Sequence, residues 1–390
     1  MEKLEKSVPV IRFKGFSEAW EQRKLGKEVE NVATGRSTFF TSIEQSSETP
    51  YAVLGSTSVI SYDKNFDHSG DFILTARVGA NAGNLYKYSG DVKISDNTVY
   101  IQAKSLDFVY YLLNKFDLKR LSFGTGQPLV KASELKNLKL MFPNDEEEQQ
   151  KIGKFFKYLD DTIALHQHKL DTLKQMKKGF SQQIFPENDR KKPKIRFNSF
   201  CEEWEQRKIG EYGYFYYGKS APKWSVTQDA TTPCVRYGEL YTKFGPEIDI
   251  VHSYTNIDKS NLKFSSGNEV LVPRVGENPL DFANCSWLSL SNVAIGEMIS
   301  VYNTEQYPLF IAYYFRSKMK YEFAKRVEGG NVSNLYYSYL EDILISVPSI
   351  DEQKKIAEFL NKIDITINLL QNKLDRIKEL KKAYLQNMFI

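Results

Sequence analysis

Two long stretches of the chain place apolar residues at alternating steps of four and three, with polar positions between them. One stretch follows Glu148 and the other follows Glu352, and each keeps the pattern for more than four heptads. A strict 3.5-residue period over this length favours a coiled-coil seam over amphipathic helices that each cover a separate globule. The predicted seam comprises Ile152, Phe156, Leu159, Ile163, His166, Leu170, Leu173, Lys177, Phe180 and Ile184 in the first helix, and Ile356, Leu360, Ile363, Ile367, Leu370, Leu374, Ile377, Lys381, Tyr384 and Met388 in the second.

Lysines occupy two equivalent seam positions, Lys177 and Lys381. A polar seam residue can fix the register of a coiled coil at a cost in stability. A long lysine side chain near a helix end more commonly extends to solvent. We expect the second arrangement here.

Outside these helices, short apolar or β-branched runs are flanked by Gly, Asp, Asn or Pro, which is typical of strands. Helical runs are interspersed with them, without a β-α-β rhythm, so the pattern predicts mixed α/β globules. The expected strands cover 72–75, 98–101, 138–142, 269–272 and 343–347, and the expected helices cover 108–113 and 308–323.

The chain also repeats itself. Residues 11–24 return as 195–208 with ten of 14 positions identical, and the start of the first long helix, 148–152, returns as 352–356. Internal repeats of this kind decide the fold, and each half is predicted to be a variable module followed by a helix. A charged, Pro-bounded linker follows the first helix. The predicted segments are a module at 1–145, a helix at 146–186, a module at 187–347 and a helix at 348–390.

Composition narrows the possible functions. The net charge is only +4, from 53 basic and 49 acidic residues, which permits nucleic-acid binding through local patches. The three cysteines form no CxxC pair, so neither a disulfide framework nor a zinc site is predicted, and a reducing cytoplasmic setting fits best. Neither a secretory signal nor an 18-residue apolar span is visible, so we expect a soluble cytoplasmic protein.

One segment, 213–220, matches the Walker A pattern G-x-x-x-x-G-K-[ST]. A phosphate-binding loop has to follow a buried apolar strand, and the preceding residues 204–211 are too polar for one. The first copy has Gly35-Arg36-Ser37 at the equivalent place, without the Walker spacing. We therefore expect no nucleotide binding by this chain.

Three matched pairs of turns are candidate DNA contacts. Gly35-Arg36-Ser37 and Gly218-Lys219-Ser220 offer a cation and a hydroxyl for phosphate oxygens or base edges. Arginines that follow apolar strands can bind guanine bidentately, and Gln or Asn beside glycines can bind adenine. The alternatives are ordinary surface turns, or arginines paired with core carboxylates. The candidates are Arg36, Ser37, Arg77, Gln127, Lys219, Ser220, Arg274 and Asn331.

Other groups of residues give weaker evidence for a function. The tyrosines of segment 212–217 are read as core residues in preference to base-stacking platforms. His166 and His168 diverge on a helix and form no metal site. We find no adenine-methylation motif, no cofactor loop of the Phe-x-Gly-x-Gly type and no convincing nuclease cluster. The sequence therefore lacks the catalytic motifs that an enzyme of these classes would need.

This arrangement resembles the DNA-specificity subunit of type I restriction–modification systems over essentially the whole chain. The resemblance rests on the Ile-Arg-Phe and Trp-Glu-Gln-Arg-Lys openings at 11–24 and 195–208. It also rests on the closing segments at 142–152 and 347–356, in which Phe-Pro or Val-Pro precedes the Glu-Gln helix start.

The resemblance implies an α+β fold in which two target-recognition domains are separated by two long helices forming an antiparallel coiled coil, with a pseudo-twofold repeat. Each domain would read one half of a bipartite site in double-stranded DNA. The chain would be non-catalytic and hold no cofactor. Two methyltransferase subunits would methylate adenine using S-adenosylmethionine, and restriction/translocase subunits would use ATP and magnesium.

Overall fold

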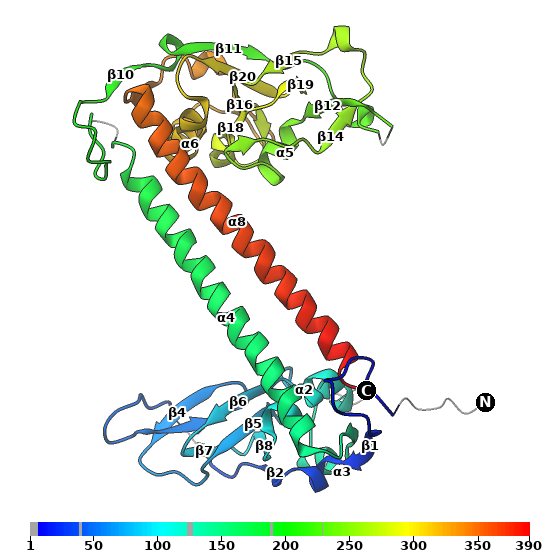
Figure 1. The fold of residues 1–390 in the computed structure, drawn as a ribbon. Coiled ribbons are helices and arrows are strands. Elements are labelled where there is room, and N and C mark those ends of the chain that lie inside the picture. Colours follow the sequence, from blue (N-terminus) through cyan, green and yellow to red (C-terminus); the bar gives the residue numbers. More distant parts are fainter. Residues whose placement is uncertain (1–6, 39–40, 123–127, 188–189, 228) are drawn as a thin grey trace. The chain divides into compact units, whose positions relative to one another are not determined.

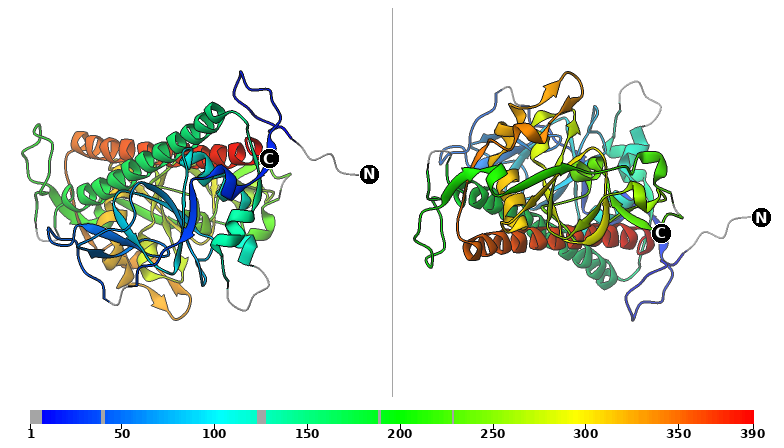
Figure 2. Two further views of the ribbon diagram at one scale, coloured as in Figure 1. Left: turned by 90° about the horizontal axis from the view of Figure 1, so that it is seen from below. Right: turned by 90° about the horizontal axis from the view of Figure 1, so that it is seen from above.

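The computed structural model describes every residue except 1–6, 39–40, 123–127, 188–189 and 228. It divides into two units, the first formed by Met1–His168 with Asn372–Ile390 and the second by Lys169–Gln371. Two continuous helices, α4 (Glu146–Gln183) and α8 (Ile350–Asn387), each begin in one unit and end in the other (Figures 1 and 2). The first helix stops three residues before the predicted end because Ile184 and Phe185 turn into the core of the second unit.

The first unit contains nine strands and three short α-helices in the described part of the chain. The strands are β1 Glu21–Lys24, β2 Asn31–Thr34, β3 Tyr51–Leu54, β4 Val59–Asp63, β5 Asp71–Ala76, β6 Leu85–Ser89, β7 Val92–Ile94, β8 Thr98–Gln102 and β9 Lys139–Phe142. The helices are α1 Leu25–Glu28, α2 Leu106–Phe116 and α3 Ala132–Asn137.

The second unit repeats and extends this set. Its strands are β10 Glu205–Lys208, β11 Gly213–Tyr217, β12 Thr232–Val235, β13 Glu247–Ile248, β14 Ser253–Thr255, β15 Phe264–Ser266, β16 Glu269–Pro273, β17 Val275–Gly276, β18 Ser286–Leu288, β19 Ser291–Ile295, β20 Ile299–Thr304, β21 Glu328–Gly329, β22 Ser333–Asn334 and β23 Leu344–Val347. Its helices are α5 Tyr237–Thr242, α6 Pro308–Lys318 and α7 Lys320–Ala324, so the helix predicted over 308–323 is interrupted at Met319.

The sheets of the two units have the same plan. Strand order β2-β8-β5-β6 in the first unit corresponds to β11-β20-β16-β18-β13 in the second, and β4-β3-β7 corresponds to β14-β12-β19-β15. The pairs β3–β7 and β12–β19 are parallel, whereas most other pairs are antiparallel. The predicted α+β class and its internal repeat are therefore confirmed.

Each repeated opening segment ends in a strand that pairs with the strand leading into the long helix. In the first unit β1 pairs antiparallel with β9, and in the second β10 pairs with β23. The tryptophans that precede these strands, Trp20 and Trp204, are almost fully buried. The recurring Trp-Glu-Gln-Arg-Lys sequence thus attaches each module to its helix.

A buried ion pair joins the two repeated parts of each half of the chain, the opening segment and the start of the long helix. Arg12 donates from Nε to Glu148 Oε1 at 2.6 Å and from Nη2 to Oε2 at 2.8 Å. Arg196 makes the same bidentate pair with Glu352, both bonds measuring 2.7 Å. Burying a carboxylate is tolerable only where its charge and hydrogen bonds are matched, so the repeat retains both partners.

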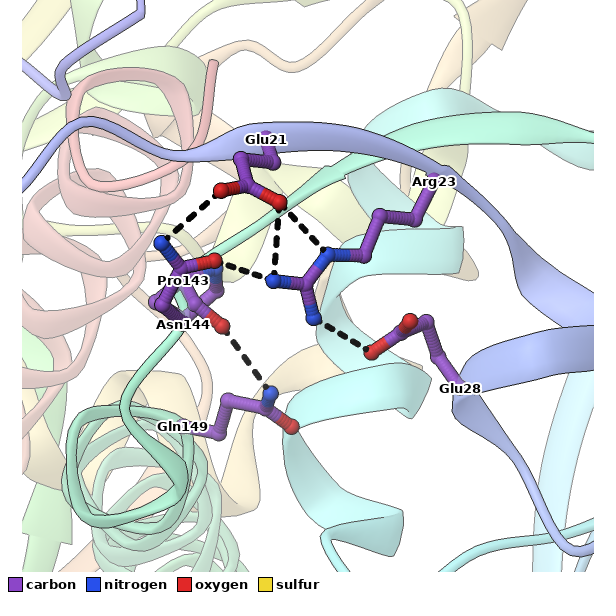
Figure 3. Close-up of polar contacts among 6 residues, drawn as sticks. All are labelled: Glu21, Arg23, Glu28, Pro143, Asn144 and Gln149. Carbon is purple, nitrogen blue, oxygen red and sulfur yellow. Dashed lines mark hydrogen bonds and ion pairs between the residues drawn. The ribbon is translucent and has the colours of Figure 1, made fainter.

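In the first unit a second arginine of the repeat, Arg23, is surrounded by hydrogen-bond acceptors (Figure 3). Arg23 on β1 bonds to Glu21 at 3.0 Å and to Glu28 at 3.2 Å, and also donates to Asn144. Its counterpart in the second unit, Arg207, pairs with Glu205 alone among carboxylates of the described residues. This network joins β1, α1 and the segment before α4 in one unit only.

The ends of the long helices complete the core of each unit. Ile152 and Phe156 at the start of α4 pack in the first core with Met388 and Phe389 from the end of the chain. The second core contains the matching residues, which are Ile184, Phe185, Ile356 and Leu360.

Within each unit the two long helices run antiparallel. In the first unit Phe155 packs edge-to-face on Tyr384, with 5.2 Å between ring centroids, and in the second Phe180 packs on Phe359 at 5.1 Å. None of the twenty predicted seam residues is exposed, and eight of them are buried, including Leu170 and Leu374.

The expectation that the seam lysines extend to solvent is wrong. Lys177 pairs with Asp364 at 2.5 Å, and Lys381 pairs with Asp160. The second oxygen of each aspartate accepts a hydrogen bond from a tyrosine of the adjoining module. Tyr313 donates to Asp364 at 2.8 Å and Tyr111 donates to Asp160 at 2.6 Å. The lysines stay in the seam because an acidic residue of the facing helix receives them.

Among the described residues, no helix is apolar over enough of its length to cross a membrane.

Candidate nucleic-acid interface

The first two pairs of candidate turns meet at one end of the main sheet in each unit. The backbone N–H of Gly35 donates to Thr98 O, and that of Arg77 donates to Asn97 O, both at 2.9 Å. The two acceptors are neighbours at the start of the central strand β8. The turn after β2 and the turn after β5 therefore lie on either side of it.

The second unit reproduces this arrangement. Gly218 N–H donates to Ile299 O at 3.0 Å, and Arg274 N–H donates to Met298 O at 3.2 Å, where the central strand β20 begins. Lys219 and Arg274 are thereby held at the same end of the sheet, as Arg36 and Arg77 are in the first unit.

The third pair of candidates is described in one copy only. Gln127 lies outside the described residues, whereas Asn331 is exposed at the tip of the β21–β22 hairpin. This hairpin, orange in Figure 2, pairs through β22 with β17, which directly follows Arg274. Leu335 N–H also donates to Arg274 O at 2.9 Å. The segments that carry Lys219, Arg274 and Asn331 are thus joined by backbone hydrogen bonds.

The glycines of the first pair are required by close backbone packing. A Cβ atom on Gly35 would lie 2.3 Å from Ile94 O, and one on Gly218 would lie 2.1 Å from Gly296 O. After Gly218 the chain passes through two left-handed residues, Ser220 with φ 65° and Ala221 with φ 64°. The Walker-like residues 213–217 form strand β11, so this segment contains no phosphate-binding loop.

The side chains of this pair differ in availability. Arg36 is exposed, but the Ser37 hydroxyl donates to Asp67 Oδ2 at 2.7 Å, and Asp67 also bonds to His68. Ser37 is therefore engaged within the protein. Lys219 is exposed and makes one long hydrogen bond, 3.4 Å from Nζ to Ser260 O.

The two strand-end arginines have different environments. Arg77 is exposed, whereas Arg274 is half-buried with its Cζ atom 4.6 Å from the ring centroid of Tyr217 and 5.7 Å from that of Tyr336. No carboxylate of the described residues pairs with either arginine, which removes the core ion pair as an explanation for them. Burial raises the pKa of Tyr217 although the Arg274 guanidinium opposes this, so its ring stays neutral.

A cavity of about 320 Å³ adjoins this cluster, and two of the residues that line it are cations that the sequence patterns did not identify. These are Lys223 and Arg236, and Tyr237 lines the cavity beside them. Arg236 directly follows the buried strand β12, the same signal that identified Arg77 and Arg274. It was missed because the first copy has Gly55 at the end of the equivalent strand β3.

The tyrosine segment is mixed. Tyr212 is buried, as expected, but Tyr214 is 61% exposed. Lys263, not predicted from sequence, lies 5.0 Å over the ring of Tyr216 and donates to Tyr217 O at 2.9 Å. No group of three or more potential metal ligands occurs among the residues that the structure describes.

Comparison with known proteins identifies two matches within the chain to one family, the type I restriction modification DNA specificity domain, at residues 17–175 and 201–379. The putative type I restriction enzyme MjaX specificity subunit of Methanocaldococcus jannaschii is 26% identical over 70% of this chain. That match spans 65% of the relative's length, slightly less than two thirds. The MjaVIII specificity subunit of the same organism is 25% identical over 78% of this chain and 75% of the relative.

A solved structure has the same fold. The crystal structure of a type I restriction–modification S subunit from M. genitalium matches with a TM-score of 0.66 and 13% identity, over 98% of this chain and 99% of that one.

Proposed function

Because the chain belongs to the type I restriction modification DNA specificity domain family, we propose that it is the DNA-recognition subunit of a type I restriction–modification complex. Each module reads one half of a bipartite duplex site, and partner subunits methylate adenine or cleave the DNA. The chain itself performs no catalysis. The observation that carries this proposal is the occurrence of two specificity domains in one chain.

The recognition surface is the sheet end at which the candidate turns converge in each unit. Exposed cations such as Arg36 and Lys219 suit phosphate contacts, which position a protein on DNA without reading sequence. Side chains with a fixed direction suit base edges in the major groove. The two units differ in sequence at these turns, so the two half-sites differ as well.

The long helices set the spacing of the half-sites. Each contains 38 residues and is roughly 57 Å long at 1.5 Å per residue. One turn of DNA covers about 34–36 Å, so helices of this length suit half-sites separated by more than one turn. The paired seam lysines oppose slippage of one helix along the other.

Two methyltransferase subunits dock on equivalent surfaces of the helices. Leu165 and Leu369 are 65% and 64% exposed at equivalent positions, and Met176 and Leu380 form a second equivalent pair at 48% and 45%. Large exposed apolar side chains that recur in both copies favour two identical partners. S-adenosylmethionine binds to those partners, ATP and magnesium bind to restriction/translocase subunits, and the complex acts in the cytoplasm.

Exchange of modules tests the proposal. Residues 187–347 are replaced by the corresponding module of a relative, the chain is produced with its methyltransferase subunit, and methylated adenines are mapped across a genome. We expect one half-site to change while the other half-site and the spacer persist. A change in both half-sites, or methylation without any bipartite site, would contradict the proposal. The matched control exchanges residues 1–145 and should change the opposite half-site.

A further inference from the structure

Arg274 is held in place by the protein while its guanidinium lacks an acceptor. Its Nε atom is buried without a hydrogen-bond partner, and in the described part of the chain no carboxylate forms an ion pair with the side chain. An unsatisfied buried donor destabilises the free protein. From this position we infer that Arg274 reads a guanine in the half-site contacted by the second unit, an inference that rests on the proposed function.

The direction of this side chain is fixed at both ends. The backbone of Arg274 donates to Met298 O and accepts from Leu335 N–H, directly after a strand whose five residues are all buried. The guanidinium then lies against the rings of Tyr217 and Tyr336, at 4.6 and 5.7 Å from their centroids. Aromatic contacts of this kind attract the cation and restrict its rotation.

A fixed, planar guanidinium fits guanine better than phosphate. Guanine presents O6 and N7 as paired acceptors in the major groove, and arginine offers two parallel donors to them. A phosphate contact needs no such alignment and is served by an exposed lysine such as Lys219. The exposed Asn331 is a second candidate for base contact, because it lies on the hairpin that pairs with the strand after Arg274.

The first unit provides the matched comparison. Arg77 occupies the equivalent strand end, with its N–H on Asn97 O and its carbonyl bonded to Val130 N–H. No tyrosine ring of the described residues lies against Arg77, and its side chain is exposed. Arg77 is consequently free to adopt many directions, and we assign guanine readout to Arg274 alone.

The test uses the complete complex of this chain with its methyltransferase subunit. Binding is measured for duplexes in which 7-deazaguanine, which lacks the N7 acceptor, replaces each guanine of the second half-site in turn. One substitution should weaken binding by the wild-type complex by roughly 5- to 150-fold. The same substitution should have little further effect on the R274A complex, because the contact is already lost.

Methylation mapping gives an independent readout. R274A should relax the base requirement at that one position and leave the first half-site unchanged, whereas R77A should leave the second half-site intact. If R274A fails to assemble, the inference is tested with R274K and with the 7-deazaguanine scan of the wild-type complex. The inference is overturned if no guanine N7 matters in the second half-site, or if its base requirements survive R274A. Absence of any bipartite site in the wild-type map would instead overturn the proposed function.

Discussion

Lys177 of α4 and Asp364 of α8 form an ion pair with 2.5 Å between Nζ and Oδ1, inside the seam of the long helices. The aspartate also accepts a hydrogen bond from Tyr313 of the adjoining module. Burial and the Asp364 charge both raise the pKa of the Tyr313 phenol, which therefore remains a donor. One carboxylate thus connects a helix, its antiparallel neighbour and the recognition module.

Replacing Lys177 by methionine should destabilise the chain by roughly 1–3 kcal/mol, because it leaves the largely buried Asp364 without a cation. The cost falls below that of a fully buried pair since 29% of the lysine side chain is exposed. Urea denaturation followed by circular dichroism measures the change. A double-mutant cycle with Asp364→Asn should give a coupling energy of at least about 0.5 kcal/mol.

The neighbouring Lys178 supplies the control for this experiment. It is exposed on the same helix, and Lys178→Met should alter stability by no more than about 0.5 kcal/mol. Equal effects of the two substitutions would show that the seam pair contributes no more than an exposed lysine.

Two glycines of α4 should respond in opposite directions to the same substitution. A Cβ atom on Gly153 would lie 2.7 Å from the backbone N of Phe108, where α2 crosses the helix. A Cβ atom on Gly179 would meet nothing within 4 Å. Gly153→Ala should therefore cost about 1–3 kcal/mol through overpacking, and Gly179→Ala should stabilise by up to about 1 kcal/mol through helix propensity.

Thermal denaturation of the two variants checks these signs. The midpoint should fall for Gly153→Ala and stay or rise for Gly179→Ala. A stabilised Gly153→Ala protein would mean that α2 does not pack closely on α4.

The repeat made the framework predictable from sequence. The openings, the helix starts and the heptads are kept alike in both halves because the same contacts recur, as Arg12–Glu148 and Arg196–Glu352 illustrate. Periodicity identified the seam positions without identifying their partners. Asp160 and Asp364 lie beside the seam, and nothing in the pattern assigns them to lysines more than 200 and nearly 190 residues away in sequence.

The candidate interface was less predictable, because side-chain availability depends on neighbours distant in sequence. Ser37 and Ser220 occupy equivalent positions in the two copies, but it is the Ser37 hydroxyl that donates a hydrogen bond to Asp67. Arg77 and Arg274 also looked equivalent, and the tyrosines that distinguish Arg274 come from β11 and from the segment after β22. A comparison of the two copies identifies residues that both of them contain. It does not identify Arg236, which occurs in the second copy and has no arginine counterpart in the first.

The cysteines should separate by reactivity. Cys201 is exposed, whereas Cys234 and Cys285 are buried. Burial raises the pKa of Cys234 to about 11 and raises that of Cys285 further, so both stay protonated thiols at pH 8. Treatment of the native chain with a maleimide at pH 8 should label one cysteine, and denaturation should expose all three, counted by intact mass. Rapid labelling of Cys234 in the native state would contradict the buried β12 strand.

Substitutions in the exposed apolar positions should change the stoichiometry of the complex by whole subunits. Leu165 and Leu380 belong to the first unit, and Met176 and Leu369 belong to the second. If the two exposed residues of each unit form part of one docking surface, the double substitution Leu165→Glu and Leu380→Glu should remove one of two methyltransferase copies. Docking would bury two carboxylates that lack partners. Light scattering after size-exclusion chromatography should then give one copy in place of two. Glutamates at Met176 and Leu369 should remove the other copy, and Asn372→Glu, an exposed position of α8, should remove neither. Retention of both copies in the first two variants would place the docking surface elsewhere on the chain.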